Sequence, residues 1–339
     1  MCKFSIIIPC YNATEYVDRA IKSAVNQTYG RDAYEIIAVN DASTDDTLSK
    51  LEKWQSDYPD IVKIISYDVN LRQGGARNIA IKASKGEYIC FLDSDDRIAP
   101  DCLEIYGKLI KTTNADMIVT RHVDEIGYFG QEEIPTSTCE PQILNLYNMK
   151  DNPSEIISED LGYVCCAAYR KEIIINNEIW FPEHLAFEDI YWPRVFRTYV
   201  HSICVSDAVT YYRFDNPVST MNKKNASHHI DRLTVYEMLL AEYDRLGIIT
   251  KEYEVILNET METYYFNSYF MFFTRLDEIP DVYARIRNTI YRYFPDWESR
   301  YDDSSLPMIF QYMIKLLIKA SNVSPKDLIP FKESMLEMI

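Results

Sequence analysis

The first hundred residues alternate β-rich runs with helical segments, and this alternation restricts the fold more than any other feature of the chain. Strands are predicted over residues 4–8, 34–39, 62–67 and 87–92. Helices are predicted between them, over about residues 14–27, 47–58 and 70–84. Suitable N-caps are Asn12 or Thr14 for the first helix and Thr44 or Asp45 for the second. Strands and helices that alternate through short loops are typical of a mostly parallel sheet with helices on both faces.

The rest of the chain predicts further strands and then a run of helices. A helix is expected over residues 100–113, strands over 116–120 and 161–170, a helix from Glu188, and two paired strands over 202–209 and 211–214. Residues 125–153 look irregular, and a loop of that length is usually functional or mobile. From Ile230 onward the pattern is helical and rich in Tyr and Phe. We therefore expect residues 226–339 to form a helical C-terminal extension.

Composition excludes some classes of partner and favours one compartment. The net charge of −17 argues against a nucleic acid or an anionic membrane held by bulk charge. The eight cysteines include no CxxC pair and lie largely in apolar runs, which predicts buried thiols in a reducing compartment. No segment reads as a signal peptide, and the apolar run over residues 308–318 is interrupted and short of the roughly 20 residues that span a bilayer. We expect a cytoplasmic protein.

Three carboxylates follow the fourth predicted strand within four residues. Asp93, Asp95 and Asp96 repel one another, and a divalent cation would relieve this repulsion. Hard oxygen ligands suit Mg²⁺ or Mn²⁺. Because α/β proteins bind nucleotides at the carboxyl ends of sheet strands, this acidic turn is a candidate metal and nucleotide site. The alternative is a solvated acidic loop.

Polar residues also follow the first two strands. Pro9 ends the first strand, and the ring of Tyr11, next to Asn12, offers a contact for a base; the alternative is a core Tyr beside a helix cap. Asp41 ends the second strand. Its carboxylate can accept the imide N–H of uracil, or it can form an Asx turn that caps the next helix.

The segment Gly74-Gly75-Ala76-Arg77-Asn78 opens the third helix. Its small residues stand where a backbone can approach a ligand, and Arg77 can pair with Asp41 or Asp93 or reach the nucleotide. It is neither a Walker loop nor a GxGxxG loop. The alternative is an ordinary helix start.

Two later motifs carry charge. Glu188 and Asp189 stand among apolar residues, which would raise a carboxyl pKa and suit a general base, or they are acids at a helix N-terminus. Arg213, after Tyr211 and Tyr212, would face a diphosphate or an acceptor, or it belongs to a surface hairpin. The adjacent pair His228-His229 is more typical of solvent than of a metal site.

Taken in order and spacing, these motifs resemble family 2 inverting glycosyltransferases over roughly residues 1–225. The resemblance implies a GT-A fold with a nucleotide-binding half (residues 1–97) and an acceptor half (residues 98–225). It implies a nucleotide-sugar donor, usually a UDP-sugar, a Mn²⁺ or Mg²⁺ ion at the Asp-x-Asp turn, and inversion by direct displacement. Asn40 stands where many relatives have Asp. The Gln-x-x-Arg-Trp element of processive relatives is absent, which favours transfer of single sugars.

The resemblance also implies roles for individual residues. The nucleotide would be bound by Pro9, Tyr11, Asn12, Asp41, Arg77 and Asp93. Asp95 would bind the metal, with Asp93 shared between ribose and metal, and Asp189 would be the catalytic base. Glu188 and Arg213 would face the acceptor or the diphosphate, and Asp96 would be a turn or cap residue with no chemistry.

Other functions remain open on the sequence. An Asp-x-Asp phosphohydrolase is one, although those enzymes place the motif on the first strand; a binding module that holds a nucleotide-sugar without turnover is another. The acceptor is expected to be a saccharide or a lipid-linked saccharide, as in surface polysaccharide synthesis. The aromatic stretch over residues 253–273 would then rest on a membrane at its inner face, or, as we favour, form a packed helical layer or a homodimer contact.

Overall fold

The computed structural model describes residues 2–125, 140–148, 163–214, 216 and 225–336. The chain forms two compact units. We call them the sheet unit (Met1–His184 and Trp192–Pro217) and the helical unit (Leu185–Tyr191 and Val218–Ile339). The division falls within helix α7, Glu188–Tyr199, next to Pro193. Proline has no N–H to donate, so the hydrogen bonding of α7 is interrupted near this division.

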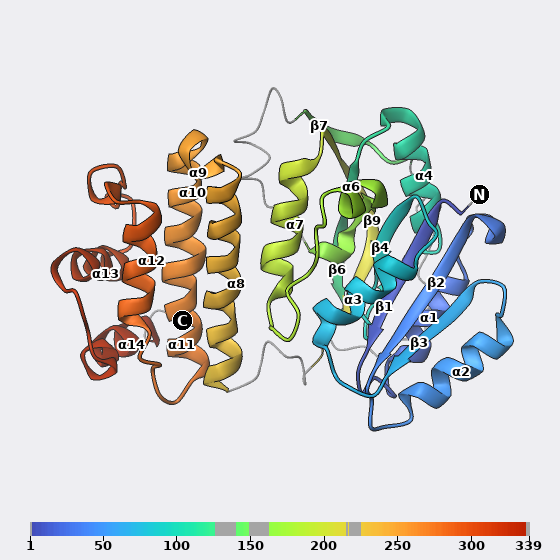
Figure 1. Cartoon of the computed structure of the whole chain (residues 1–339), viewed down its shortest axis with the longest axis horizontal. Coiled ribbons are helices and arrows are strands. Elements are labelled where there is room, and N and C mark those ends of the chain that lie inside the picture. The colour runs from blue at the N-terminus through green and yellow to red at the C-terminus, as the bar shows by residue number, and fades with distance from the viewer. Residues whose placement is uncertain (1, 126–139, 149–162, 215, 217–224, 337–339) are drawn as a thin grey trace. The chain divides into compact units, whose positions relative to one another are not determined.

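The sheet unit is built on one mixed sheet, which has nine strands in the described part of the chain (Figure 1). Its order is β3-β2-β1-β4-β8-β6-β9-β5, and β7 pairs with β9 outside this path. The strands are β1 (Phe4–Cys10), β2 (Tyr34–Asp41), β3 (Val62–Tyr67), β4 (Tyr88–Phe91), β5 (Arg97–Ile98), β6 (Met117–Glu125), β7 (Ile143–Asn148), β8 (Ala167–Arg170) and β9 (Ser202–Phe214).

The first half of the sheet is parallel, as the sequence predicts. Strand β1 pairs in parallel with β2 and β4, and β2 pairs in parallel with β3. The helices of the sheet unit are α1 (Val17–Val25), α2 (Thr47–Asp57), α3 (Arg72–Ala83), α4 (Cys102–Thr113), α6 (Lys171–Asn176) and the larger part of α7. Short 3₁₀ turns occur at Arg31–Ala33 and Val164–Cys166. With helices on both faces, β1, β2 and β4 are buried along their whole length.

The chain reverses its direction of travel across the sheet at β1. It moves outward from β1 to β2 and β3, and α3 then carries it back across β2 and β1 to β4. Right-handed crossovers therefore place α1 and α2 on one face and α3 on the other. The carboxyl ends of β1 and β4 meet at this reversal, which is where open α/β sheets bind ligands.

The second half of the sheet differs from the sequence prediction in two places. Residues 202–214 form the single strand β9, which runs parallel to β6, instead of two paired strands. The register of β6 and β9 shifts near Arg121, so a bulge absorbs the irregular residues that suggest a turn. Strand β7 lies in the segment predicted to be irregular, and it pairs with β9 although most of its side chains are exposed.

The predicted N-cap of the first helix is also wrong. Helix α1 begins at Val17 without a side-chain cap, because Asn12 binds the loop after β2 instead. At α2 the N-cap position is Asp46, which makes no side-chain cap; Asp45, one residue earlier than the N-cap, accepts from the amide of Thr47, the first helical residue, at 3.1 Å. The same carboxylate accepts from the amide of Thr14 at 3.2 Å.

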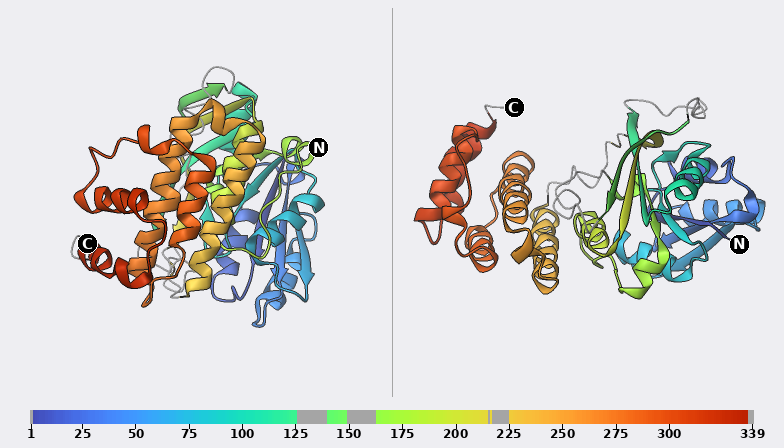
Figure 2. Two further views of the ribbon diagram at one scale, coloured as in Figure 1. Left: turned by 60° about the vertical axis from the view of Figure 1, so that its left-hand side comes forward. Right: turned by 90° about the horizontal axis from the view of Figure 1, so that it is seen from above.

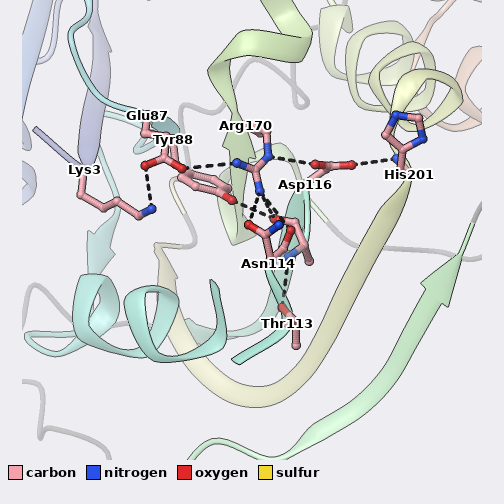
Figure 3. A network of polar contacts seen from close by, with 9 residues as sticks. Lys3, Glu87, Tyr88, Thr113, Asn114, Asp116, Arg170 and His201 are labelled. Atoms are coloured by element: carbon pink, nitrogen blue, oxygen red, sulfur yellow. Dashed lines mark hydrogen bonds and ion pairs between the residues drawn. The ribbon is translucent and has the colours of Figure 1, made fainter. Parts of the chain in front are cut away.

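A polar network fixes the opposite edge of the sheet (Figure 3). Arg170 at the end of β8 donates to Asp116 at 2.8 Å, and it contacts Glu87 at 3.3 Å. Asp116 also accepts from the amide of His201 at 2.8 Å, and Glu87 pairs with Lys3 at 2.7 Å. These contacts tie β8 to the starts of β4, β6 and β9. The charged residues at this edge therefore have a structural role.

The helical unit consists of helices alone in its described part (Figure 2). Its elements are α8 (Ala226–Arg245), α9 (Ile248–Lys251), α10 (Tyr253–Glu259), the π-helical segment η4 (Thr260–Phe266), α11 (Asn267–Arg275), α12 (Tyr283–Tyr293), η5 (Trp297–Ser299), α13 (Met308–Lys319), η6 (Pro325–Leu328) and α14 (Ile329–Leu336). Tyr264, Tyr265, Tyr269 and Phe272 are buried, so most of the aromatic stretch over residues 253–273 is core of the helical unit and not an exposed membrane surface. His228 and His229 are buried as well, which contradicts the solvent prediction; both pack against Phe187.

Two further observations concern the whole described chain. The seven cysteines in it are free thiols, and six of them are buried. None of its helices has both the length and the apolar character needed to cross a bilayer.

Candidate active site

The loops after β1 and β2 are joined by the side chain of Asn12. Its Oδ1 accepts from the backbone amide of Thr44 at 2.8 Å, and its backbone N–H donates to Ser43 Oγ at 3.1 Å. Asn12 has φ +48°, a left-handed conformation that Asn tolerates better than most residues. The preceding Tyr11 is 52% exposed. Asn12 therefore has a structural task here, whereas the ring of Tyr11 is available for a ligand.

Asp41 is buried at the end of β2. Its Oδ1 accepts from the amide of Leu71 at 2.7 Å, and its carbonyl accepts from Asn70 Nδ2 at 3.0 Å. Burial raises the pKa of this carboxyl above its ordinary value, although hydrogen bonds from the backbone amides of Leu71 and Arg72 lower it in part. Asp41 thus fixes the start of α3 and does not cap α2, which rejects the Asx-cap alternative.

Arg77 pairs with Asp93, one of the two partners that the sequence allows. The Nη2–Oδ1 distance is 2.8 Å, and Arg77 is almost wholly buried. Its guanidinium lies over the rings of Phe91 and Phe181, at 5.7 and 5.3 Å from their centroids. The cation is therefore held in a desolvated aromatic setting, where the carboxylate of Asp93 compensates its charge.

The small residues at the start of α3 let another segment of the backbone pack closely against this helix. A Cβ on Gly74 would lie 2.2 Å from the carbonyl oxygen of Pro182. One turn further, Asn78 exchanges hydrogen bonds with the backbone of Phe181, at 2.8 and 3.0 Å. The close approach that the sequence assigns to a ligand is thus made by residues 181–183 at this position.

The acidic turn after β4 is anchored by the end of β9. Tyr211 Oη donates to Asp96 Oδ2 at 2.5 Å and accepts from the amide of Asp93 at 3.2 Å. Asp96 Oδ1 accepts from the amide of Phe214 at 2.7 Å. Asp96 is buried and ties the turn to β9, which is a larger role than the plain turn or cap predicted. The sequence around Asp96 contains no signal that this residue anchors the turn to β9.

Two further residues hold Asp95. Asn216 Nδ2 donates to Asp95 Oδ2 at 2.9 Å, and Arg19 donates to its backbone carbonyl. Arg19 also lies 4.7 Å from the ring of Phe214 and pairs with Glu125 at 3.4 Å. Sequence reasoning missed Arg19, Asn216 and Tyr211, because each comes from a segment far from the turn.

Burial and mutual repulsion disfavour the charged forms of the carboxylates in the acidic turn. Burial raises the pKa of Asp95, and the neighbouring Asp93 raises it further. Burial followed by Asp93 and Asp95 raises the pKa of Asp96 to about 8. A cation bound at the turn would offset this repulsion.

The donor set fits a hard divalent ion that shares its coordination with a ligand. No cluster of three or more His, Cys, Asp or Glu side chains suited to a metal occurs among the described residues. Asp93 and Asp95 offer carboxylate oxygens, and Mg²⁺ is commonly bound through one or two carboxylates together with substrate phosphates and water. The residues present are therefore compatible with Mg²⁺ or Mn²⁺.

Arg213 lies on β9 and is engaged by its neighbours. Its Nε and Nη2 donate to the carboxylate of Asp124 on β6 at 2.8 and 2.9 Å. Its Nη1 donates to Tyr163 Oη at 2.5 Å, and its side chain is 40% exposed. The hairpin alternative is wrong, since β9 is continuous here. Any contact of Arg213 with a ligand would use the exposed part of its side chain.

Glu188 and Asp189 open α7 and belong to the helical unit. Glu188 is buried, whereas Asp189 is exposed. The preceding Phe187 has φ +63°, which is unusual for a bulky side chain. Its ring is buried between His228, His229 and Arg232. The apolar surroundings inferred from the sequence thus enclose Glu188 but leave Asp189 accessible.

A cavity of about 580 Å³ lies elsewhere, at the starts of β2 and β3. Its lining includes Cys2, Glu35 and Lys63, and Glu35 is already paired with Lys63. It is at the edge of the sheet opposite to the acidic turn. It contains none of the predicted site residues.

Comparison with known proteins assigns the chain to a family. The model of the family "Glycosyl transferase family 2" matches residues 5–177, just over half of the chain. The chain belongs to glycosyl transferase family 2. One family relative is the poly(ribitol-phosphate) beta-N-acetylglucosaminyltransferase TarS of Staphylococcus aureus, 26% identical over 255 residues, which are 72% of this chain and 42% of TarS. Another is the poly(ribitol-phosphate) beta-glucosyltransferase of Bacillus spizizenii, 42% identical over 116 residues, 34% of this chain and 18% of that enzyme.

Solved structures confirm the predicted GT-A fold. The crystal structure of S. aureus TarS 1-349 in complex with UDP-GlcNAc superposes with a TM-score of 0.70 at 22% identity, covering 99% of this chain and 92% of that one. The mannosyltransferase PcManGT of Pyrobaculum calidifontis, in complex with GDP-Man and Mn²⁺, gives a TM-score of 0.51 at 14% identity, covering 98% and 85%. Both show a similar fold. This chain spans less than half the length of the two curated relatives named above.

Proposed function

We propose that this chain is an inverting glycosyltransferase that moves one sugar from a nucleotide-sugar, specifically a UDP-sugar, to a hydroxyl of a saccharide or lipid-linked saccharide. The observation that carries the proposal is the anchored acidic turn at the reversal point of a family 2 sheet. Relatives with poly(ribitol-phosphate) transferase activity support an acceptor in surface polysaccharide synthesis.

In this proposal the two ends of the donor have separate sites. Tyr11 contacts the base from its exposed position, and Asp41 accepts from the uracil imide with the carboxylate oxygen that Leu71 does not occupy. Pro9 and Asn12 shape the loop beneath them. Asp93 contacts the ribose, and Arg77 acts through Asp93 as a positioning residue instead of touching the nucleotide.

Asp95, with Asp93, would hold the Mn²⁺ or Mg²⁺ ion. Bound there, the ion would neutralise the diphosphate leaving group. Arg19, Asn216 and Tyr211 keep the turn in place, so its carboxylates need no large rearrangement on loading. Without a cation, burial and then the neighbouring charge of Asp93 raise the pKa of Asp95.

Asp189 is the proposed general base. The acceptor hydroxyl oxygen attacks the anomeric carbon, the bond from that carbon to the diphosphate oxygen breaks with its electron pair on the diphosphate, and the hydroxyl proton passes to Asp189. The exposure of Asp189 supports this role, because a base must be reachable by the acceptor. Glu188 and Arg213 would face the acceptor or the diphosphate.

The organisation and location of the protein follow from the same proposal. Residues 1–97 would form the nucleotide-binding half, residues 98–225 the acceptor half, and residues 226–339 a helical extension. We place the protein in the cytoplasm, where free thiols persist. A lipid-linked acceptor would bring it to the inner face of the membrane, and a homodimer is compatible with the extension.

A donor screen tests the proposal. The purified chain is mixed with Mn²⁺ and a panel of UDP-, GDP- and dTDP-sugars, and thermal stabilisation and slow donor hydrolysis are measured. We expect one UDP-sugar to stabilise the protein and to be hydrolysed only with metal. Stabilisation without hydrolysis or transfer to any acceptor would identify a binding module. Hydrolysis of simple phosphomonoesters would identify a phosphohydrolase.

A further inference from the structure

Helix α13 is apolar on both of its faces, although only one face is packed. Met313, Ile314 and Leu317 are buried in the helical unit. The ring of Phe310 lies 4.8 Å from that of Phe266 on η4. A helix that is hydrophobic all round is normally enclosed, so the other face of α13 needs an explanation.

The outward face of α13 exposes large apolar side chains. Met308 is 69% exposed, Tyr312 is 54% exposed and Ile318 is 37% exposed. Exposed lysines stand on the same face, because residues 308, 312, 315 and 319 follow the spacing of one helical stripe. We call Met308, Tyr312, Lys315, Ile318 and Lys319 the α13 face. Figures 1 and 2 show α13 beyond α12 as seen from α8, at the outer side of the helical unit.

The charge of this segment is opposite to that of the chain. Residues 304–326 contain three lysines, Lys315, Lys319 and Lys326, and no acidic residue. The whole chain carries a net charge of −17. Asp302, Asp303 and Asp327 flank this segment, so the positive charge is confined to the α13 face, which carries two lysines and no acidic side chain.

We propose that the α13 face rests on an anionic lipid surface, with Met308, Tyr312 and Ile318 in the headgroup boundary and the two lysines among the lipid phosphates. Exposed apolar side chains and lysines on one face supply the two contributions that hold a helix at a membrane surface, buried apolar area and attraction to anionic lipids. The flexible lysine stems let the ammonium groups reach the phosphates, and Tyr is well suited to the interface. Lys315 Nζ lies 5.4 Å from the centroid of the Tyr312 ring, so the charged and aromatic groups are adjacent.

A second copy of the chain fits this face less well. A two-fold contact through the α13 face would bring its lysines against those of the partner, which is unfavourable. The aromatic stretch over residues 253–273 is not an alternative membrane surface, because most of it is buried. The inference deepens the proposed location at the membrane and rests on no assumption about donor or acceptor.

Vesicle flotation of the full chain tests the inference. The probes are vesicles of phosphatidylcholine alone and of phosphatidylcholine with 30% phosphatidylglycerol, without donor or acceptor. We expect binding to the anionic vesicles only, and weaker binding as salt is raised. Lys315→Gln or Lys319→Gln should each lower the partition coefficient about fivefold, and the Met308→Ser/Tyr312→Ser double variant at least tenfold.

Matched control variants in the sheet unit test whether the loss of vesicle binding is specific to the α13 face. Val69→Ser removes a side chain that is 66% exposed, and Lys111→Gln removes an exposed lysine. Both should bind vesicles as the parent chain does, and an unchanged melting temperature of every variant verifies folding. Equal losses in the α13 and control variants, or no binding to anionic vesicles, would overturn the inference. So would self-association that Tyr312→Ser abolishes without any vesicle binding, which would make a second copy the occupant.

The result is distinguishable from failure of the proposed function. Vesicle binding is measured without catalysis, so a chain that binds lipid but transfers no sugar supports the inference and contradicts the function. A chain that transfers sugar but does not bind anionic vesicles supports the proposed function and contradicts the inference.

Discussion

Arg77 and Asp93 form an ion pair at the acidic turn, with 2.8 Å between Nη2 and Oδ1 and with the buried guanidinium over the rings of Phe91 and Phe181. The pair connects α3 to the end of β4, and hence two segments that the chain brings together only through the sheet. It assigns Asp93 two tasks, since the same carboxylate is a candidate ligand of ribose and metal. Replacing Asp93 should therefore affect stability as well as activity.

Asp93→Ala should lower the free energy of unfolding by about 2–3 kcal/mol, because it leaves a buried guanidinium without its carboxylate. The value is below that of a wholly buried pair, since Asp93 is partly exposed. Denaturant unfolding measures it. Asp124→Ala is the control: it breaks the exposed pair with Arg213 and should cost at most about 1 kcal/mol. Similar losses in both variants would contradict the importance of the buried pair.

Asp95→Ala should abolish the thermal stabilisation by Mn²⁺ with donor and leave the stability of the free protein nearly unchanged or raised. The expected reason is that the variant no longer buries a carboxylate beside Asp93, since burial and then Asp93 raise the pKa of Asp95. Differential scanning fluorimetry with and without Mn²⁺ and donor measures both. A variant that retained full metal-dependent stabilisation would exclude Asp95 as a ligand.

Asp189→Asn should retain donor binding and lower kcat for transfer by about 10²–10⁴, the usual contribution of a general base. The amide keeps the size of the side chain but cannot take the hydroxyl proton. Transfer kinetics and donor-induced stabilisation, measured on the same preparation, separate the two effects. Glu188→Gln, at the buried neighbour, is the matched variant; if it alone lost transfer, the base would be Glu188.

Tyr211→Phe should lower the free energy of unfolding by about 1–2 kcal/mol and reduce kcat tenfold or more. The hydroxyl donates to Asp96 and accepts from the amide of Asp93, so its loss loosens the turn that holds Asp95. Tyr212→Phe removes the next hydroxyl on β9 and should change neither quantity. Parallel melts and kinetics of the two variants make the comparison, and unchanged kcat in Tyr211→Phe would show that the turn holds without this anchor.

Asp45→Ala should lower stability by about 1 kcal/mol at pH 7, as expected for the loss of a helix cap. Burial slightly raises the pKa of Asp45, but hydrogen bonds from Thr47 and Thr14 bring it down to about 2, below its ordinary 3.8. A depressed carboxyl pKa contributes stability above pH 3.8, and that contribution is lost as the pH falls toward 2. The difference between parent and variant should therefore shrink over this range in melts at graded pH. Asp46→Ala, which removes a carboxylate with no capping hydrogen bond, should show no such change.

Gly74→Ala should destabilise the sheet unit by about 1–3 kcal/mol, because the new Cβ would lie 2.2 Å from the carbonyl oxygen of Pro182. Gly30→Ala is the control, since its Cβ would meet only the movable end of Asp32 at 3.1 Å. Equal stability of the two variants would mean that residues 181–183 can shift freely away from α3.

The strands and the acidic turn were predictable because their signals are local. Buried parallel strands read as apolar runs, and the polar residues at their ends follow directly, so β1 to β4 and the position of Asp93 and Asp95 came from the pattern alone. The continuity of β9 and the existence of β7 were not predictable, because a bulge and an exposed edge strand lack such a pattern. The cap of α1 failed for a related reason: Asn12 has a better partner in the loop after β2.

The sequence by itself determined the parallel first half of the sheet, the family and the identity of the candidate carboxylates. Only the tertiary structure decided how these groups are held: that Arg77 pairs with Asp93, that Asp96 is an anchor for Tyr211, and that Asp189 is exposed while Glu188 is buried. It also decided that the aromatic stretch is core and that α13 presents the exposed apolar face. The physical reason is that hydrogen bonds and burial depend on contacts between segments distant in the chain, whereas strand and helix patterns depend on neighbours.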